Sequence, residues 1–388
     1  MGKKYQRELK FPDNKSFFLF GPRGTGKTTW LIDNFPKAVY IDLLKSSNYN
    51  SLLARPERLE EFIPNNFSDW IIIDEIQKVP ELLNEVHRLI ENKKYKFILT
   101  GSNARKLKKE GTNLLAGRAL TYYAHPLTVK ELGEDFNLRK SLKFGNMPAV
   151  YSEKNEKEYL ESYVATYLNQ EVFQEGLTRN LSAFSRFLEV ASFSQGSVLN
   201  ISEVSRECSI NRKVAENYFS ILEDLLMAYF VPSFTKKSKR RNIKHNKFYY
   251  FDTGIYRTIK PAGPLDLPEE TDGIGLETLI LQELRATNDY ENLGYKIYFW
   301  KTVGGAEVDF ILYGEKGLIA IEIKRKSNIS GKDLRGLKLF LKDYPNAKAF
   351  LLYGGKEKLY YDKITALPIE YFLKNISKVL NLYELNDN

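Results

Sequence analysis

The sequence predicts an α/β protein, with a parallel sheet covered by helices in its N-terminal part, a helical segment in the middle and a second α/β region at its C-terminal end. In residues 1–127, short β-branched or aromatic runs alternate with helical patterns, which is typical of a parallel sheet with helices on both faces. From Tyr159 to Met227 the apolar spacing is helical, and beyond Ala228 strand-like runs return.

Length and composition narrow the class of protein. A chain of 388 residues is long enough for two or three domains of roughly 100 to 200 residues each. The single cysteine, Cys208, cannot form an internal disulfide, so we expect a reducing, cytoplasmic setting. No apolar run approaches the roughly 18 residues that a membrane span requires, and the basic N-terminus runs into polar residues. Neither membrane insertion nor secretion is therefore expected.

Five runs in the N-terminal part predict the strands of the parallel sheet, and one run predicts a helix. The apolar spacing of residues 80–92 is helical. The strand-like runs are rich in β-branched and aromatic residues. They cover residues 16–21, 38–43, 70–75, 96–102 and 119–127.

A phosphate-binding loop follows the first predicted strand. Residues 21–29, GPRGTGKTT, fit the pattern G-x-x-x-x-G-K-[ST]. The glycines let the backbone turn tightly and aim several N–H groups at phosphate oxygens, at the positive end of the next helix. Lys27 would reach the β- and γ-phosphates, and the Thr28 hydroxyl would ligate Mg²⁺. The predicted ATP-binding residues are Gly21, Pro22, Arg23, Gly24, Thr25, Gly26, Lys27, Thr28 and Thr29.

Two adjacent acids end the predicted strand 70–75. Burial of a carboxylate at the end of a buried strand costs free energy unless a positively charged group or ion lies beside it. We therefore expect Asp74 to hold Mg²⁺ through water, and Glu75 to orient and deprotonate the attacking water. A strand that simply ends in polar residues is the alternative.

Three further residues extend the predicted nucleotide site. Ser102 and Asn103 follow the strand 96–102, where a polar side chain could bridge the water and the γ-phosphate; a turn or a helix cap is the alternative. Arg118 precedes the last strand and could act as an arginine finger toward a neighbouring subunit. It could equally be a solvated surface charge.

The middle of the chain carries the pattern of a winged helix-turn-helix. Val204 and Cys208 are four residues apart, and after a short turn Val214, Tyr218, Ile221 and Leu225 recur at helical spacing. Two such helices followed by a strand are typical of this motif, and Arg212 and Lys213 would begin the second helix. Residues 236–247 then carry seven lysines or arginines and no acid, against a net charge of +9 for the chain. We interpret this basic cluster as a wing that contacts DNA, with a solvated loop or a helix pair for subunit packing as the alternative.

Near the C-terminal end, residues 306–312 and 317–324 predict an antiparallel hairpin. If its turn centres on Glu315 and Lys316, Asp309 lies opposite Glu322. Two carboxylates in a cross-strand pair repel each other, and a divalent cation would remove that conflict.

Lys324 shares a strand face with Glu322, while Ile321 and Ile323 would point into the core. This pattern resembles the PD-(D/E)xK nuclease fold. The resemblance implies that Asp309 and Glu322 bind Mg²⁺ or Mn²⁺ and that Lys324 acts on the water or the transition-state charge, with Glu277 as a third acid. An exposed Glu-x-Lys that arises by chance is the alternative.

The whole chain resembles the AAA+ class of P-loop ATPases, and more narrowly a family of bacterial and archaeal ATPases whose C-terminal half is a domain of unknown function. The resemblance implies an ATPase joined to a nuclease-like module, and it does not indicate which substrate the protein acts on. FGNMPAV departs from the expected Gly-Gly-Leu-Pro type of turn. The matching motifs are GPRGTGKTT, WIIIDEIQKVPEL, ILTGSNAR, LAGRA, YYFDTGIYRTI, GLETLILQEL, GGAEVDFIL and AIEIK.

Taken together, these patterns predict an AAA+ domain over residues 1–130, a helical linker with a winged helix over 131–245 and a restriction-endonuclease-like α/β domain over 246–388. The expected cofactors are ATP and Mg²⁺, with a second Mg²⁺ or Mn²⁺ at the C-terminal acids. The expected partners are DNA and further copies of the chain in an AAA+ oligomer. The competing hypothesis is a nucleotide-dependent protein-interaction switch whose nuclease-like domain is inactive.

Overall fold

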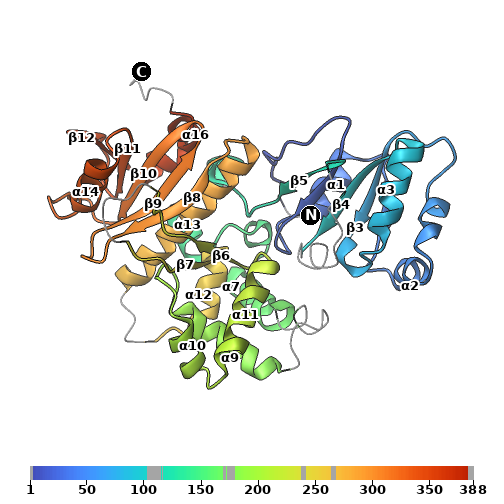
Figure 1. The fold of residues 1–388 in the computed structure, drawn as a ribbon, viewed down its shortest axis with the longest axis horizontal. Helices are drawn as coiled ribbons and strands as arrows, with labels where there is room; N and C mark the ends of the chain where they lie inside the picture. Colours follow the sequence, from blue (N-terminus) through green and yellow to red (C-terminus); the bar gives the residue numbers. More distant parts are fainter. Residues whose placement is uncertain are drawn as a thin grey trace. The chain divides into compact units, whose positions relative to one another are not determined.

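The computed structural model describes residues 3–102, 115, 117–168, 172, 180–236, 242–263 and 268–382. The chain divides into two compact units (Figure 1). One comprises Gln6–Pro126 with Asp224–Met227, and the other comprises Met1–Tyr5, Leu127–Glu223 and Ala228–Asn388. The first predicted boundary, at residue 130, is close to Pro126. The boundary predicted at residue 245 lies inside the second unit and stays a prediction.

The N-terminal unit contains a five-stranded parallel sheet, as the sequence predicts. The strand order is β2-β3-β4-β1-β5, so β4 lies between the strand before the phosphate-binding loop and the strand that ends in the two acids. Because all five strands are parallel, their carboxyl ends meet at one edge. The strands are β1 (Ser16–Phe20), β2 (Val39–Asp42), β3 (Trp70–Asp74), β4 (Lys96–Gly101) and β5 (Ala119–Tyr123).

Helices cover both faces of this sheet. Phe18 and Phe20 of β1 belong to a buried cluster that includes residues of α3, whereas Phe17 and Leu19 belong to a second cluster with residues of α1. Successive strand residues point to opposite faces, so a continuous apolar run is what a doubly covered parallel sheet requires. The helices of this unit are α1 (Lys27–Asn34), α2 (Ser46–Ala54) and α3 (Leu82–Lys93), with 3-10 turns η1 (Pro56–Phe62) and η2 (Ile76–Lys78).

The first half of the other unit is mainly helical, as its apolar spacing predicts. It also contains the antiparallel pair of β6 (Ala228–Val231) and β7 (Lys247–Tyr250), which α12 follows. The helices are α5 (Val129–Leu132), η3 (Gly133–Asp135), α6 (Leu138–Phe144), η4 (Pro148–Tyr151), α7 (Glu156–Ser162), η5 (Tyr163–Leu168), α9 (Leu181–Ser192), α10 (Ile201–Glu207), α11 (Arg212–Asp224) and α12 (Thr253–Ile259).

The second half of this unit is built on a mixed six-stranded sheet in the order β12-β13-β11-β10-β9-β8. β8, β9 and β10 form an antiparallel meander, and β11 then pairs in parallel with β10. The elements are α13 (Pro268–Tyr290), β8 (Lys296–Lys301), β9 (Glu307–Gly314), β10 (Gly317–Lys324), α14 (Arg335–Asp343), β11 (Lys348–Tyr353), β12 (Leu359–Tyr361), β13 (Ile364–Pro368), α15 (Ile369–Lys374) and α16 (Ile376–Leu380).

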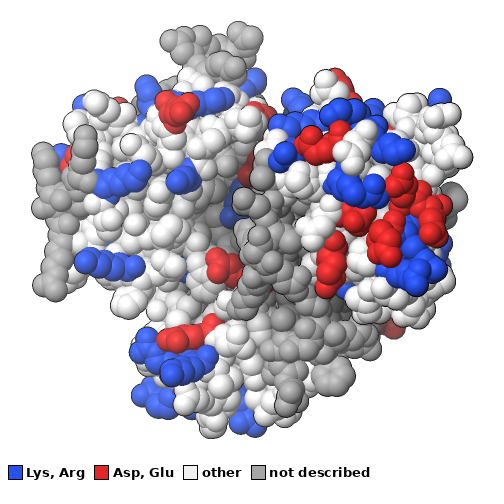
Figure 2. Space-filling view, turned by 45° about the vertical axis from the view of Figure 1, so that its right-hand side comes forward, with Lys and Arg blue, Asp and Glu red and all other residues white. Residues whose placement is uncertain are grey.

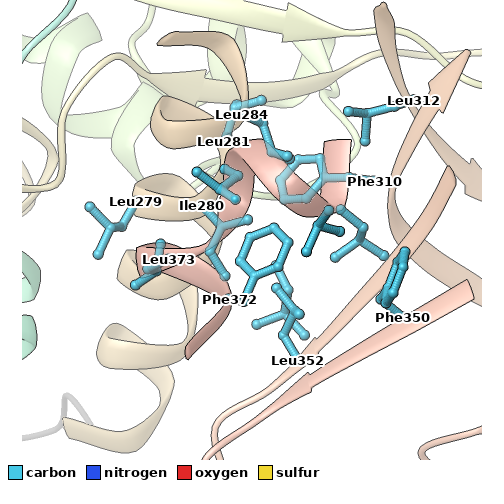
Figure 3. Packing of buried hydrophobic residues seen from close by; sticks show 14 of the residues in the cluster. Leu279, Ile280, Leu281, Leu284, Phe310, Leu312, Phe350, Leu352, Phe372 and Leu373 are labelled. Carbon is cyan, nitrogen blue, oxygen red and sulfur yellow. The ribbon is translucent and has the colours of Figure 1, made fainter. Parts of the chain in front are cut away.

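Figure 3 shows the packing that fixes α13 against this sheet. Phe310 of β9 and Phe350 of β11 belong to one buried cluster with Ile280 of α13 and Phe372 of α15. The opposite face of the sheet packs against α14 through a second cluster. Burial of this apolar surface makes the main contribution to the stability of the domain. It packs α13 against β9.

The surface drawn in Figure 2 carries separate groups of lysine and arginine side chains, with acidic side chains among them. Within the described residues, no helix is both long and apolar enough to span a bilayer.

Candidate functional site

The phosphate-binding loop has the backbone that its glycines predict. Gly24 and Gly26 have φ values of 78° and 84°, in the left-handed region that favours glycine. A Cβ atom on Gly21 would lie 2.4 Å from the carbonyl oxygen of Ala124, so only glycine fits this close approach to the chain after β5. The loop then leads directly into α1 at Lys27.

Hydrogen bonds from side chains to backbone carbonyl oxygens stabilise the loop. The buried ammonium of Lys27 donates to the carbonyl oxygens of Gly21 (2.7 Å) and Pro22 (3.0 Å). The Thr25 hydroxyl donates to the same Pro22 carbonyl (2.8 Å). Arg7 donates to the carbonyl of Thr25 at 2.6 Å, a contact that no sequence pattern indicated. Arg23, Thr28 and Thr29 lie on the exposed side of the loop and of the first helical turn.

Asp74, at the end of β3, lies beside the loop. Thr28 Oγ1 donates to Asp74 Oδ2 at 3.1 Å. The hydroxyls of Tyr40 and Thr100 also donate to the Asp74 carboxylate, and burial together with Asp74 raises the pKa of Tyr40 well above its ordinary value. A hydroxyl and a carboxylate side by side are the oxygen ligands that Mg²⁺ prefers, so these residues fit the ion that accompanies ATP.

Glu75 has a left-handed backbone, with φ 61°, which is uncommon for a residue other than glycine. Gln77, buried two residues later, donates through Nε2 to Glu75 Oε2 and to Ser102 Oγ (3.4 Å). Ser102 Oγ in turn lies 3.5 Å from Glu75 Oε2. The structure therefore brings Glu75 and Ser102 together through Gln77, which sequence reasoning missed, although it stands in the quoted motif WIIIDEIQ.

Asn103 and Arg118 are the remaining residues predicted for the nucleotide site. Asn103 lies outside the described residues. Arg118 forms an ion pair with Glu91 of α3 in the same chain, and both side chains are exposed. Its predicted role as an arginine finger stays a prediction.

In the C-terminal hairpin, the observed register agrees with the predicted one. The last paired residues before the acids are Ile321 and Phe310, so Asp309 and Glu322 stand one step further along the same ladder. The backbone N–H of Ile323 donates to Asp309 Oδ2 at 2.8 Å. Ile321 and Ile323 are buried in the core, as predicted.

The acidic cluster, defined here as Glu277, Glu307, Asp309 and Glu322, contains a lysine that the sequence did not place there. Lys247 Nζ lies 2.6 Å from Glu307 Oε1, 3.8 Å from Asp309 Oδ1 and 3.9 Å from Glu277 Oε2. The sequence assigned Lys247 to the basic cluster 236–247, and that placement is wrong for this residue. Its side chain is only 3% exposed, because Lys247 begins the buried strand β7.

The carboxyl groups of this cluster are perturbed in different directions. Burial, and then the charge of Asp309, raises the pKa of Glu277 to about 7. The same causes raise the pKa of Glu322 well above its usual value, although Lys324 opposes them. Burial opposes ionisation of Glu307 too, but Lys247 and Lys301 hold its pKa below the ordinary value.

The second divalent ion expected at Asp309 and Glu322 stays a prediction, and lysines lie beside the acids that would bind it. In the part of the chain that the structure describes, no three His, Cys, Asp or Glu residues are grouped as metal ligands. Lys324 Nζ lies 2.5 Å from Glu322 Oε1, and Lys247 lies among the other three acids. Glu322 Oε2 is buried and accepts no hydrogen bond, which is the one feature here that favours an added ligand.

The predicted winged-helix segment has two helices and a strand pair in the expected order, α10, α11, β6 and β7. Val204, Cys208, Tyr218, Ile221 and Leu225 are buried, as their spacing predicts, whereas Val214, near the start of α11, is 37% exposed. At the start of α11, Arg212 pairs with Glu216 at 2.9 Å.

The basic cluster is described only at its two ends. Residues 237–241 lie outside the described part of the chain. The ammonium of Lys236 lies 4.2 Å from the centre of the Tyr313 ring, and Lys244 is exposed.

Three family models match successive parts of the chain. Residues 13–133 match an AAA domain. Residues 135–266 and 272–372 match two domains of unknown function, DUF8612 and DUF4143.

Similar curated proteins come from bacteria and archaea. An uncharacterized protein of Mycobacterium tuberculosis is 26% identical over 365 residues, which is 92% of this chain and 80% of that protein. An uncharacterized protein of Methanocaldococcus jannaschii is 26% identical over 369 residues, covering 87% of this chain and 81% of that one.

Two solved structures have low scores against this chain. The Aeropyrum pernix ORC1 protein in complex with DNA has a TM-score of 0.25 at 14% identity, covering 64% of this chain and 87% of that one. Protein VC1899 from Vibrio cholerae has a TM-score of 0.23 at 12% identity, covering 95% and 97%. Scores at this level do not establish a shared overall fold. The AAA match, the phosphate-binding loop and the parallel sheet together support a P-loop ATPase domain of the AAA class in the N-terminal part of this chain.

Proposed function

We propose that the protein binds ATP with Mg²⁺ at the carboxyl edge of the parallel sheet and hydrolyses it. The observation that carries this proposal is the 3.1 Å contact between Thr28 Oγ1 and Asp74 Oδ2, which joins the phosphate-binding loop to the acid of β3. Thr28 and Asp74 would hold the ion, directly or through water. Mg²⁺, when bound, would neutralise charge on the phosphates.

The remaining residues of this site supply recognition and proton transfer. The backbone N–H groups of residues 21–29 and the Lys27 ammonium would bind the phosphate oxygens. Glu75 would orient the attacking water and accept its proton. Ser102 lies within 3.5 Å of the Glu75 carboxylate, a position from which its hydroxyl can contact the same water. Asn103 would act beside it, and Arg118 would act on the γ-phosphate of a neighbouring copy in an oligomer.

DNA is the partner that we propose for the second unit. The six cations among residues 236–244 support it, because non-specific binding to nucleic acid is driven by contacts between cations and phosphates. The order α10, α11, β6 and β7 supports a winged helix that would present this cluster. Lys247 does not take part, because its side chain is buried.

One experiment tests both parts of the proposal. The ATPase rate is measured with and without duplex, single-stranded and branched DNA. We expect hydrolysis without DNA and a higher rate with at least one DNA. No hydrolysis under any condition would reject the ATPase assignment, and a rate that no DNA changes would reject DNA as the partner.

A second candidate function is an ATP-dependent protein-interaction switch whose C-terminal domain does not cut DNA. The position of Lys247 among the acids favours it over metal-dependent cleavage at Asp309, Glu322 and Lys324. A switch would hydrolyse ATP at a rate that responds to a protein partner and not to DNA.

A further inference from the structure

Lys247 is buried, and its ammonium lies among three residues of the acidic cluster. Its backbone pairs with Val231 of β6 on one side and forms an isolated bridge with Val198 on the other, so contacts on both sides position its Cα atom. The side chain is 3% exposed, and the ammonium lies 5.6 Å from the centre of the Phe299 ring.

The Lys247 ammonium lies near any cation that the acidic cluster would bind. A Mg²⁺ ion lies about 2.0–2.1 Å from its oxygen ligands. Lys247 Nζ is 3.8 and 3.9 Å from Asp309 Oδ1 and Glu277 Oε2, so an ion bound to both oxygens would lie within about 6 Å of the ammonium. Like charges at such a distance, away from bulk water, repel strongly.

We propose that Lys247 takes the place of a divalent cation in the acidic cluster, so that the C-terminal domain binds neither Mg²⁺ nor Mn²⁺ there. The cluster is close to charge balance without a metal: its four acids face three lysines, Lys247, Lys301 and Lys324. This inference goes beyond the proposed ATP hydrolysis and does not depend on it.

The same contacts give the cluster a structural role. Lys247 belongs to the strand pair of the helical segment, whereas Glu277 lies on α13 and Asp309 on β9. The buried ion pairs therefore tie the segment that matches one domain of unknown function to the segment that matches the other. Removal of one partner from a buried ion pair leaves the remaining charges uncompensated and is destabilising.

The test is Mn²⁺ binding to the full chain without nucleotide, measured by calorimetry and by electron paramagnetic resonance of free Mn²⁺. We expect that wild type and Asp309→Asn bind Mn²⁺ equally, because the cluster holds no metal. Lys247→Met should gain one Mn²⁺ site, at least about tenfold tighter than any site of the wild type. The double variant Lys247→Met/Asp309→Asn should lose that site.

Lys301→Met is the matched control. It removes the same charge from a lysine that also contacts Glu307 at 2.6 Å but is 31% exposed, and it should gain no site. A wild-type Mn²⁺ site that disappears in Asp309→Asn would overturn the proposal, and this comparison holds even if Lys247→Met fails to fold. A folded Lys247→Met that gains no site, or an equal gain in Lys301→Met, would overturn it too. Melting curves and ATP binding on the same samples check folding.

Discussion

Thr28 Oγ1 donates a hydrogen bond of 3.1 Å to Asp74 Oδ2 across 46 residues of sequence. Thr28 lies in the helix that follows β1, and Asp74 is the last residue of β3; these strands are not neighbours, since β4 separates them. Parallel strands nevertheless end at one edge of the sheet, and this brings the loop after β1 to the acid of β3. This contact joins the phosphate-binding loop and the acid of β3, two separate sequence motifs, in one site.

Lys27→Ala and Glu75→Gln should impair different steps of ATP turnover. Loss of the Lys27 ammonium removes a charged partner of the phosphates, so ATP affinity should fall at least about tenfold. Glu75→Gln keeps the shape of the side chain but removes the base, so ATP should bind while turnover falls about 10² to 10⁴-fold. ATP binding and single-turnover hydrolysis separate the two steps. Equal losses of affinity would mean that Glu75 has been assigned the wrong role.

Gln77→Met should slow hydrolysis without weakening ATP binding. The Gln77 amide contacts both Glu75 and Ser102, and a misplaced catalytic group can cost up to about 100-fold in rate. We expect kcat to fall about 10- to 100-fold at an unchanged KM for ATP. A raised KM with an unchanged kcat would show instead that Gln77 serves nucleotide binding.

Serine substitutions in the basic cluster should weaken DNA binding without sequence preference. If the lysines and arginines contact phosphates, the slope of log affinity against log salt should become shallower by about one unit per lost contact. Substitution of the exposed Lys348 and Lys363 provides a control with the same type of charge loss. An unchanged slope would mean that the cluster is a solvated loop. The substituted residues are Lys236, Lys237, Lys239, Arg240 and Arg241.

Gly254→Ala should destabilise the second unit. A Cβ atom on Gly254 would lie 2.0 Å from the carbonyl oxygen of Phe144, so α6 and α12 would have to separate at a cost of about 1–3 kcal/mol. Gly273→Ala is the control, because a Cβ atom there meets nothing within 4 Å and should stabilise α13 by about 0.5–1 kcal/mol. Denaturant unfolding measures both. Equal stability of the two variants would contradict the close packing.

The single cysteine should react slowly in the folded protein. Burial, with a smaller effect of Glu207, raises the pKa of Cys208 to about 11. A raised thiol pKa leaves less thiolate at pH 8, and only the thiolate is the nucleophile. Modification by a thiol reagent at pH 8 should therefore be at least about 100-fold slower than in the unfolded chain. The rate should keep rising through pH 10. Reaction at the unfolded rate at pH 8 would rule out burial of this thiol.

The sequence was sufficient where chemistry depends on local spacing. The pattern from Gly21 to Thr28 specified a turn with left-handed glycines, because no other residue adopts that backbone at little cost. In the hairpin 306–324, a turn centred on Glu315 and Lys316 predicted the observed register, and a slip by one residue would exchange the core and solvent faces of each strand. Apolar runs of strand length specified the parallel sheet, since both faces are covered by helices.

Only the tertiary structure decided which distant side chains share a site. Gln77 was visible in the sequence, but its contact with Ser102 depends on the pairing of β3 with β4 in the sheet. In the sequence, Lys247 is one of the cations of the basic cluster 236–247. Neither its position in the sequence nor its charge indicates that its side chain is buried. Its place among Glu277, Glu307 and Asp309 follows from pairing of β7 with β6 and from packing of α13 on the sheet, both of which are contacts between residues far apart in the chain.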